Sequence, residues 1–172
     1  MAKTRKLVSC ALLIAISFIG ANVTLAGSIA FDSLPAFLAT LMLGPVYGAA
    51  IGFLGHLLTA ATSGFPLSIP LHIVIAFTMA LTMLGFGYTY KLLAKKIHQV
   101  PCLTITGIIG VTLNVPVSLM FSVGALWILA GRETAFLLLA LIPILLLASI
   151  LNVVLSIILF KVLQKVPGIG VW

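Results

Sequence analysis

Residues 27–45 read GSIAFDSLPAFLATLMLGP, and they constrain the architecture more than any other part of the chain. The apolar run 34–43 ends at Gly44-Pro45 and would measure only about 15 Å as a helix, half the hydrocarbon thickness of a bilayer. If its inner end lies at the cytoplasmic face, the segment around Asp32 must enter the outer half of the membrane. Irregular backbone persists at that depth only when it is buried in protein or lines a cavity. This stretch therefore predicts a cavity that opens outward, with Ser33 capping the short helix and Pro35 in its first turn.

Longer apolar runs flank this short one on both sides. Together they predict an all-α, polytopic membrane protein with six transmembrane helices and one membrane domain over residues 1–172. The five other runs are 7–26, 46–63, 71–90, 102–129 and 135–160. Residues 24–26 also resemble a signal-peptide cleavage site, which leaves removal of the first run as an alternative to a retained helix.

Composition and charge agree with a membrane location. The chain is 63% hydrophobic and 6% charged, with a mean hydropathy of +1.38, so lipid rather than water is its solvent. Arg132 is the one cation in the loops on the opposite side from all the others, which are Lys3, Arg5, Lys6, Lys91, Lys95, Lys96, Lys161 and Lys165. Because Lys and Arg near span ends stay on the cytoplasmic side, both termini are expected in the cytoplasm of a bacterial cell. These juxtamembrane cations fit contact with anionic lipid better than binding of nucleic acid.

Several features within the runs carry local predictions. Gly48, Gly52 and Gly55 share one helix face and indicate close helix packing. Pro116 is expected to kink the fifth run, and Pro70 to open the fourth helix. The loop 64–70 contains two prolines, which limit its backbone and reduce the entropy lost if it closes over a ligand.

Polar residues inside the runs are the candidate functional groups, because they cost free energy in lipid and normally face the bundle interior. At 1.5 Å per residue, His56, Asn114 and Asn152 lie about 14–18 Å from the cytoplasmic face, in a shared layer. Asp32 is expected near that layer, and His72 above it. Each of the five could contact a ligand, or it could make a hydrogen bond between helices. For Asp32 the structural alternative is pairing with Arg132 or with a histidine.

Three aromatic side chains in the outer part of the chain are candidates for stacking on a flat ligand. They are Phe31, Phe65 and Trp127, and for Trp127 anchoring at the membrane interface is the alternative.

Enzymatic and metal-binding functions have less support. The chain contains no phosphate-binding Gly-x-x-x-x-Gly-Lys-Ser/Thr loop, no His-Glu-x-x-His and no Gly-x-Ser-x-Gly. Asp32, His56 and His72 could ligate a metal ion or act as acid and base, but they come from separate elements with irregular spacing. We expect no cofactor, no resident metal and no catalysis, and keep metal-ion uptake and a small membrane enzyme as alternatives.

The chain resembles the substrate-binding S components of energy-coupling factor (ECF) vitamin transporters in size, span number and the short second helix. Ala11-Leu12-Leu13-Ile14-Ala15 is similar to the Ala-x-x-x-Ala motif of that family, and residues 44–56 are similar to its segment joining the second and third helices. Many members carry an acid where this chain has His56, which argues against a cationic substrate such as thiamin. The resemblance implies that Ala11 and Ala15 dock on a transmembrane T component, which works with two ATPase subunits.

Within that family, residues 27–35, 55–59, 63–66 and 70–72 resemble the α-ribazole transporter subgroup. The resemblance implies capture of α-ribazole, a neutral nucleoside with a flat ring, for cobalamin salvage. Another vitamin, such as pantothenate, pyridoxine or a cobalamin, is the alternative substrate.

Overall fold

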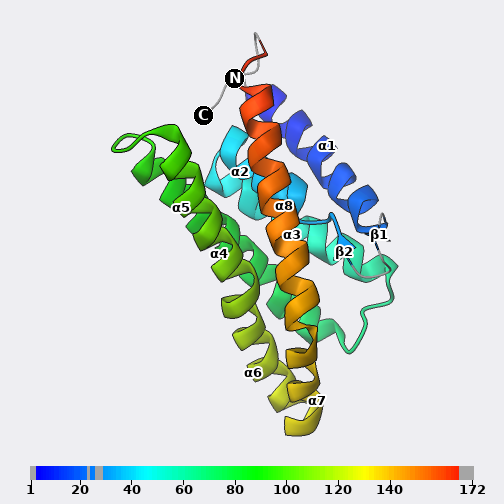
Figure 1. Ribbon diagram of the computed structural model, residues 1–172. Coiled ribbons are helices and arrows are strands. Elements are labelled where there is room, and N and C mark those ends of the chain that lie inside the picture. The colour runs from blue at the N-terminus through cyan, green and yellow to red at the C-terminus, as the bar shows by residue number, and fades with distance from the viewer. Residues whose placement is uncertain (1–2, 23, 26–28, 167–172) are drawn as a thin grey trace.

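The computed structural model describes residues 3–22, 24–25 and 29–166, and helices dominate this part of the chain (Figure 1). The chain order is α1 (Lys3–Asn22), β1 (Thr24–Leu25), β2 (Ile29–Ala30), α2 (Leu34–Leu43), α3 (Pro45–Thr62), α4 (Ile69–Leu93), α5 (Gln99–Thr112), η1 (Leu113–Val117), α6 (Ser118–Ala130), α7 (Arg132–Leu137), η2 (Leu138–Leu141) and α8 (Ile142–Leu163). The predicted runs correspond to α1, α2, α3, α4, α5–α6 and α7–α8. The helical fold class is therefore confirmed.

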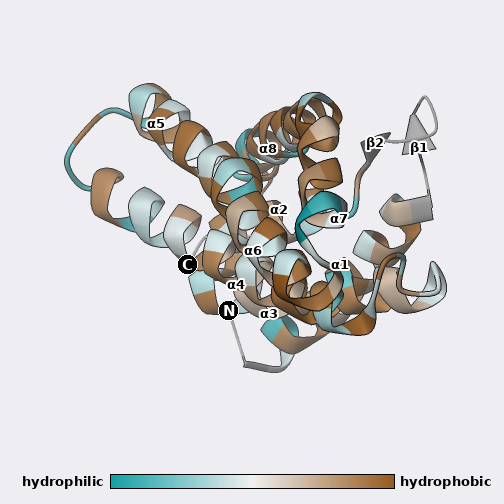
Figure 2. Ribbon diagram, turned by 90° about the horizontal axis from the view of Figure 1, so that it is seen from below, coloured by the Kyte–Doolittle hydropathy of each residue, from teal (hydrophilic) through white to brown (hydrophobic). Residues whose placement is uncertain are grey.

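Four helical stretches are long and apolar enough to cross a membrane: Thr4–Ala21, Ile69–Leu93, Gln99–Ala130 and Arg132–Leu163. They make the chain a multi-pass membrane protein. Large apolar side chains of these stretches are exposed, including Ile128 (88%) and Met120 (74%), and brown, hydrophobic residues recur along the helices (Figure 2). The number of six spans stays a prediction, because neither α2, which is short, nor α3 is among these four stretches.

The first predicted run is too long at its outer end. α1 ends at Asn22, and β1 then pairs antiparallel with β2, with Thr24 opposite Ala30. The backbone N–H of Phe31 donates to the carbonyl of Gly20 at 3.0 Å, so the chain turns back along the end of α1 instead of extending the helix. The alternative cleavage site includes Ala26, which lies outside the described residues.

α2 is the centre of the fold. Its residues from Pro35 to Leu43 are all buried, and Phe37 packs edge-on against Phe86 of α4 with ring centroids 5.0 Å apart. A second apolar cluster, centred on Leu71 and Leu126, lies where α4, α6 and α7 meet. The short helix is thus enclosed by protein, as its length requires.

The glycines of α3 pack against three helices, which confirms the packing interpretation. A Cβ added at Gly48 would lie 2.9 Å from Cα of Thr40 in α2, and one at Gly52 would lie 3.2 Å from Cγ of Met83 in α4. At Gly55 it would meet the Ser17 side chain of α1 at 2.7 Å. Small residues therefore let α3 approach all three neighbours.

The prediction that Pro70 opens α4 is confirmed, whereas the kink expected at Pro116 stays a prediction. Pro116 lies inside η1, a π-helical turn in which the N–H of Ser118 bonds to the carbonyl of Leu113. Proline has no N–H and its ring displaces the preceding turn, so the helix widens there. Pro70 lies in the first turn of α4, where Ser68 accepts a hydrogen bond from the N–H of Leu71.

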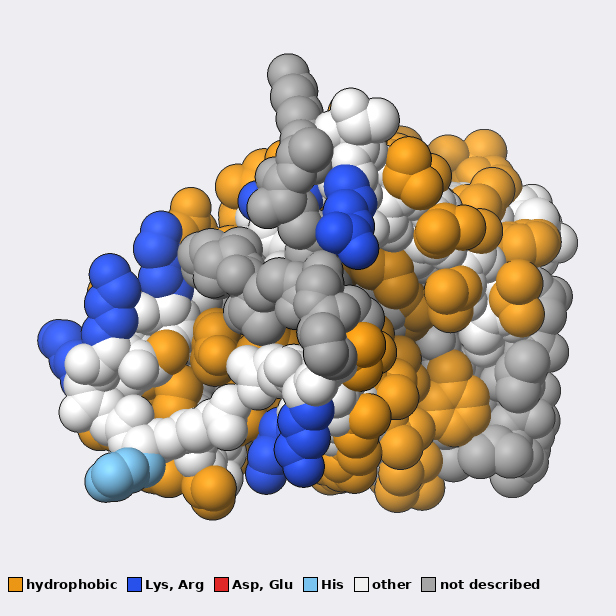
Figure 3. Space-filling model, turned by 90° about the horizontal axis from the view of Figure 1, so that it is seen from above, with side chains coloured by type: hydrophobic (Ala, Val, Ile, Leu, Met, Phe, Trp, Pro, Cys, Tyr) orange, Lys and Arg blue, Asp and Glu red, His pale blue; other side chains and the backbone are white. Residues whose placement is uncertain are grey.

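The start of α1, the connection between α4 and α5, and the end of α8 gather at one end of the molecule, and α6 and α7 meet at the other (Figure 1). The first of these ends shows blue Lys and Arg side chains and no acidic ones among the described atoms (Figure 3). The charge asymmetry expected from the sequence is thus an asymmetry of the folded molecule.

Candidate functional site

A cavity of about 300 Å³ lies at the junction of the two apolar clusters, beside the N-terminus of α2. It is lined from the α1–α2 segment, α3, the α3–α4 loop, α4, η1, α6, η2 and α8. The lining residues are Asp32, Ser33, His56, Pro66, Leu67, Leu71, His72, Ile75, Met79, Asn114, Val115, Ser118, Leu119, Ser122, Leu138, Leu141, Leu145, Ala148 and Asn152. All five intramembrane polar candidates, Asp32, His56, His72, Asn114 and Asn152, line this one space.

The short second helix positions the acidic group. The hydroxyl of Ser17 in α1 donates to the backbone carbonyl of Asp32, and the Phe31 N–H holds the same segment to Gly20. These bonds fasten the segment between β2 and α2 to the outer end of α1. Asp32 is therefore held at the edge of the cavity by backbone contacts that do not use its carboxylate.

The two histidines form a hydrogen-bonded chain to the loop above the cavity. His56 Nε2 lies 3.2 Å from His72 Nδ1, and His72 Nε2 lies 2.9 Å from the carbonyl of Pro66. The imidazole rings also stack, with centroids 5.3 Å apart. His72 thus connects α3 with the loop that follows it.

The loop itself has an unusual backbone. Besides Gly64, the non-glycine residues Phe65 (φ 50°) and Leu67 (φ 73°) adopt positive φ, which is sparsely populated for residues with a side chain. Phe65 packs edge-on against His72, with ring centroids 5.9 Å apart, while Pro66 and Leu67 line the cavity. The loop therefore forms part of the cavity wall.

The two asparagines are placed differently. Asn152 is buried and its Oδ1 accepts the N–H of Leu34 at 2.9 Å, while its Nδ2 donates to the carbonyl of Ala148. Ser33 makes no side-chain cap, so the cap expected from Ser33 comes instead from α8. Asn114 donates through Nδ2 to Ser149 Oγ at 2.9 Å, and its buried Oδ1 has no hydrogen-bond partner among the described residues.

The three aromatic candidates do not line the cavity. Phe65 contacts the lining residue His72 but does not itself line the cavity. Phe31 lies in the segment before α2, and Trp127 is half exposed and packs against Phe136 at 6.1 Å between centroids. Arg132 lies over the rings of Trp127 and Phe136 and is not among the residues that line the cavity.

Sequence reasoning missed two lining residues, Ser118 and Ser122. They follow Asn114 at steps of four and therefore lie on one face of η1 and α6. This spacing is the sequence feature from which Ser118 and Ser122 could have been predicted as lining residues.

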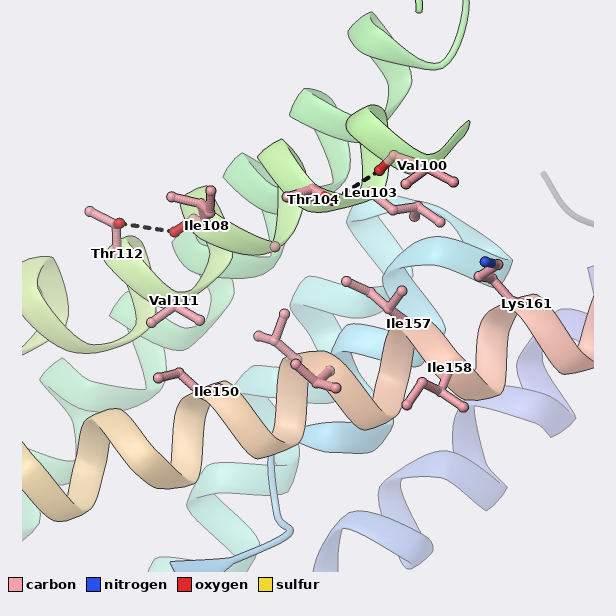
Figure 4. A pocket seen from close by; sticks show the side chains of 13 residues that line it. Val100, Leu103, Thr104, Ile108, Val111, Thr112, Ile150, Ile157, Ile158 and Lys161 are labelled. Atoms are coloured by element: carbon pink, nitrogen blue, oxygen red, sulfur yellow. Dashed lines mark hydrogen bonds between the residues drawn. The ribbon is translucent and has the colours of Figure 1, made fainter. Parts of the chain in front are cut away.

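A larger hollow of about 610 Å³ lies between α5 and α8 (Figure 4). Apolar side chains line most of it, and the hydroxyls of Thr104 and Thr112 are bonded to carbonyls of their own helix. Lys161 stands at one end. It lacks the convergent polar groups of the smaller cavity, so we place the candidate site in the smaller one.

The docking residues expected on the first helix are accessible. Ala11 and Ala15 are exposed on α1, among the exposed apolar residues Leu7, Leu12 and Ile19. Only 6% of the α1 span is buried, against 22–39% in the three other candidate spans. The helix therefore offers a long apolar face.

The described residues contain no group of three His, Cys, Asp or Glu side chains arranged to hold a metal ion.

A partly open cavity with apolar walls and a few convergent polar groups in a helical multi-pass protein is typical of sites for small organic molecules. The chain belongs to the family described as "ECF transporter, substrate-specific component", whose model matches residues 5–166. It is therefore a substrate-binding subunit of an ECF importer, and a transporter subunit that works with the T component and the ATPase subunits. No curated protein and no solved structure gave a match.

Proposed function

We propose that this subunit captures α-ribazole from outside a bacterial cell at the cavity beside α2 and delivers it to an ECF importer for cobalamin salvage. The observation that carries the proposal is that Asp32, His56, His72, Asn114 and Asn152, which are far apart in sequence, line one cavity. The proposed orientation places both termini in the cytoplasm, with six spans and the loop 64–68 on the outer side.

The size and lining of the cavity support a small, mostly apolar ligand. About 300 Å³ is at the lower end of the range for small-molecule sites, so the space suits a nucleoside better than an entire cobalamin. Leucine, isoleucine and methionine side chains make apolar walls for a flat ring, and the polar groups suit the hydroxyls of a ribose. Phe31 and Trp127 lie away from these walls, so we leave them out of the proposed contacts.

The test is a thermal-shift screen of the purified subunit with α-ribazole, pantothenate, pyridoxine and cobalamin. A ligand at 100 times its dissociation constant stabilises the folded state by about 2.7 kcal/mol. We expect the largest shift from α-ribazole. A larger shift from another vitamin would reassign the substrate, and a response to divalent metal alone would favour an ion site.

A histidine outside the cavity, His98, provides the matched control for a substitution at His56. His56→Ala should weaken α-ribazole binding about tenfold, because it removes one polar contact and the support of His72. His98→Ala changes an exposed histidine just before α5 and should leave binding unchanged. Equal binding by both variants would place the ligand elsewhere.

A further inference from the structure

The hydrogen-bond pattern of the cavity restricts what a ligand must bring, and this inference rests on the proposed function of the cavity as the substrate site. Three of the lining groups are informative because their bonds to the protein determine what they still offer.

The histidine chain fixes the protons on both rings. A carbonyl oxygen only accepts, so His72 Nε2 must carry the hydrogen that it shares with Pro66. With both rings neutral, His72 Nδ1 is then an acceptor and His56 Nε2 carries the hydrogen between the rings. His56 Nδ1 is left without a hydrogen and can only accept.

The bonds of two lining serines, Ser118 and Ser122, likewise determine where their hydroxyl hydrogens point. Thr78 gives its hydroxyl hydrogen to the carbonyl of Ile75, so Ser118 must donate to Thr78 across their 2.6 Å contact. Ser122 donates to the carbonyl of Ser118. Both lining hydroxyls therefore donate their hydrogens to other protein groups, and towards a ligand their oxygens can only accept.

Asn114 completes the set. Its Nδ2 bonds to Ser149, and its buried Oδ1 has no partner among the described residues. A buried acceptor without a partner costs about 1–3 kcal/mol, so a ligand donor that reaches it gains that amount. The π turn of η1 places this side chain at the cavity wall.

We propose that Asn114 Oδ1, His56 Nδ1 and the hydroxyl oxygens of Ser118 and Ser122 form an acceptor set that selects an uncharged ligand rich in hydroxyl or N–H donors, and that the cavity rejects the phosphorylated or carboxylated forms of that ligand. No Lys or Arg occurs among the described residues that line the cavity. An anion that entered this space would therefore lose its hydration without gaining a cationic partner, which costs free energy in the protein interior.

The first test uses pairs of compounds that differ by a phosphate. Purified protein is titrated with α-ribazole, riboflavin and pyridoxine and with the 5′-phosphate of each. We expect every compound that binds to bind at least tenfold more tightly without the phosphate. If pyridoxine or riboflavin binds and α-ribazole does not, the proposed substrate is wrong and the acceptor set is supported. Tighter binding of any phosphorylated member overturns the acceptor set and leaves a vitamin-binding subunit in place.

The second test asks which atom of Asn114 meets the ligand, with α-ribazole as the probe or, if that fails, the tightest binder of the first test. Asn114→Leu should weaken binding at least tenfold. Asn114→Ser removes the amide N–H and keeps an uncharged side-chain oxygen, so it should weaken binding clearly less than Asn114→Leu. Equal losses in both variants would mean that the amide N–H faces the ligand, which overturns the proposal.

Ser149→Ala is the matched structural control. It removes the protein partner of Asn114 and leaves the Oδ1 atom present. If the role of Asn114 were only to hold Ser149, Ser149→Ala and Asn114→Leu would weaken binding equally, and the proposal would fail. We expect Ser149→Ala to change the dissociation constant less than threefold.

Discussion

The side chain of Asn152 accepts a hydrogen bond from a backbone N–H of α2 that has no acceptor within its own helix. The first N–H groups of a helix have no partner within it, and Leu34 finds its acceptor on α8, 118 residues further along the chain. This side chain therefore joins the central helix to the last one, and its interaction with the protein is sufficient to explain its burial.

At the residue scale, Asn152→Leu should destabilise the ligand-free protein by about 1–3 kcal/mol, because the buried N–H of Leu34 loses its partner. Thermal unfolding of the purified subunit in detergent measures this. Ser156→Ala, one turn further on, is the control, since that hydroxyl bonds only to the carbonyl of Val153 in its own helix. Equal destabilisation by the two changes would show that the contact with Leu34 contributes nothing.

At the scale of elements, the packing of α2 on α3 depends on the absence of a side chain. Thr40 of α2 lies directly against Gly48 of α3, and the two helices enclose the apolar cluster beneath the cavity. The position of α2 then sets where Asp32 stands.

Gly48→Ala should destabilise the protein by about 1–3 kcal/mol, because the new Cβ would overlap Thr40. Gly124→Ala on α6 is the matched control, since a Cβ there meets nothing within 4 Å. That change should stabilise the helix by about 0.4–1 kcal/mol. Chemical or thermal unfolding would compare them, and a neutral Gly48→Ala would contradict the close approach.

At the scale of the whole molecule, the proposed ligand site and the proposed docking face occupy separate surfaces. The cavity lies at the N-terminal end of α2, and Ala11 and Ala15 lie on the exposed face of α1. The family membership supplies the partner for which an apolar, exposed helix face is suited.

Ala15→Trp should reduce co-purification with the T component severalfold and leave the ligand dissociation constant unchanged, because a bulky ring prevents close helix approach. His72→Phe should do the reverse, since it breaks the chain to Pro66 and loosens the loop. Ile128→Trp, at an exposed site on α6, is the control for a tryptophan in lipid. Loss of docking in the Ile128 variant as well would argue against a specific interface on α1.

Much of this protein could be predicted from local patterns. Apolar runs, the position of Pro70 and glycine spacing indicated the helices, the start of α4 and the packing of α3, because in lipid each helix must satisfy its own backbone bonds and its length follows from its composition. The shared depth of Asp32, His56, Asn114 and Asn152 also followed from counting residues along spans.

Only the tertiary structure decided how those polar groups divide their bonds. Depth along a helix does not specify rotation about its axis, and hydrogen bonds form between helices whose relative orientation no local pattern contains. For that reason Asn152 proved to hold Leu34, Asn114 Oδ1 stayed without a partner, and Trp127 lay outside the cavity. The chain alone determined which groups enter the membrane, and packing determined which of them a ligand can reach.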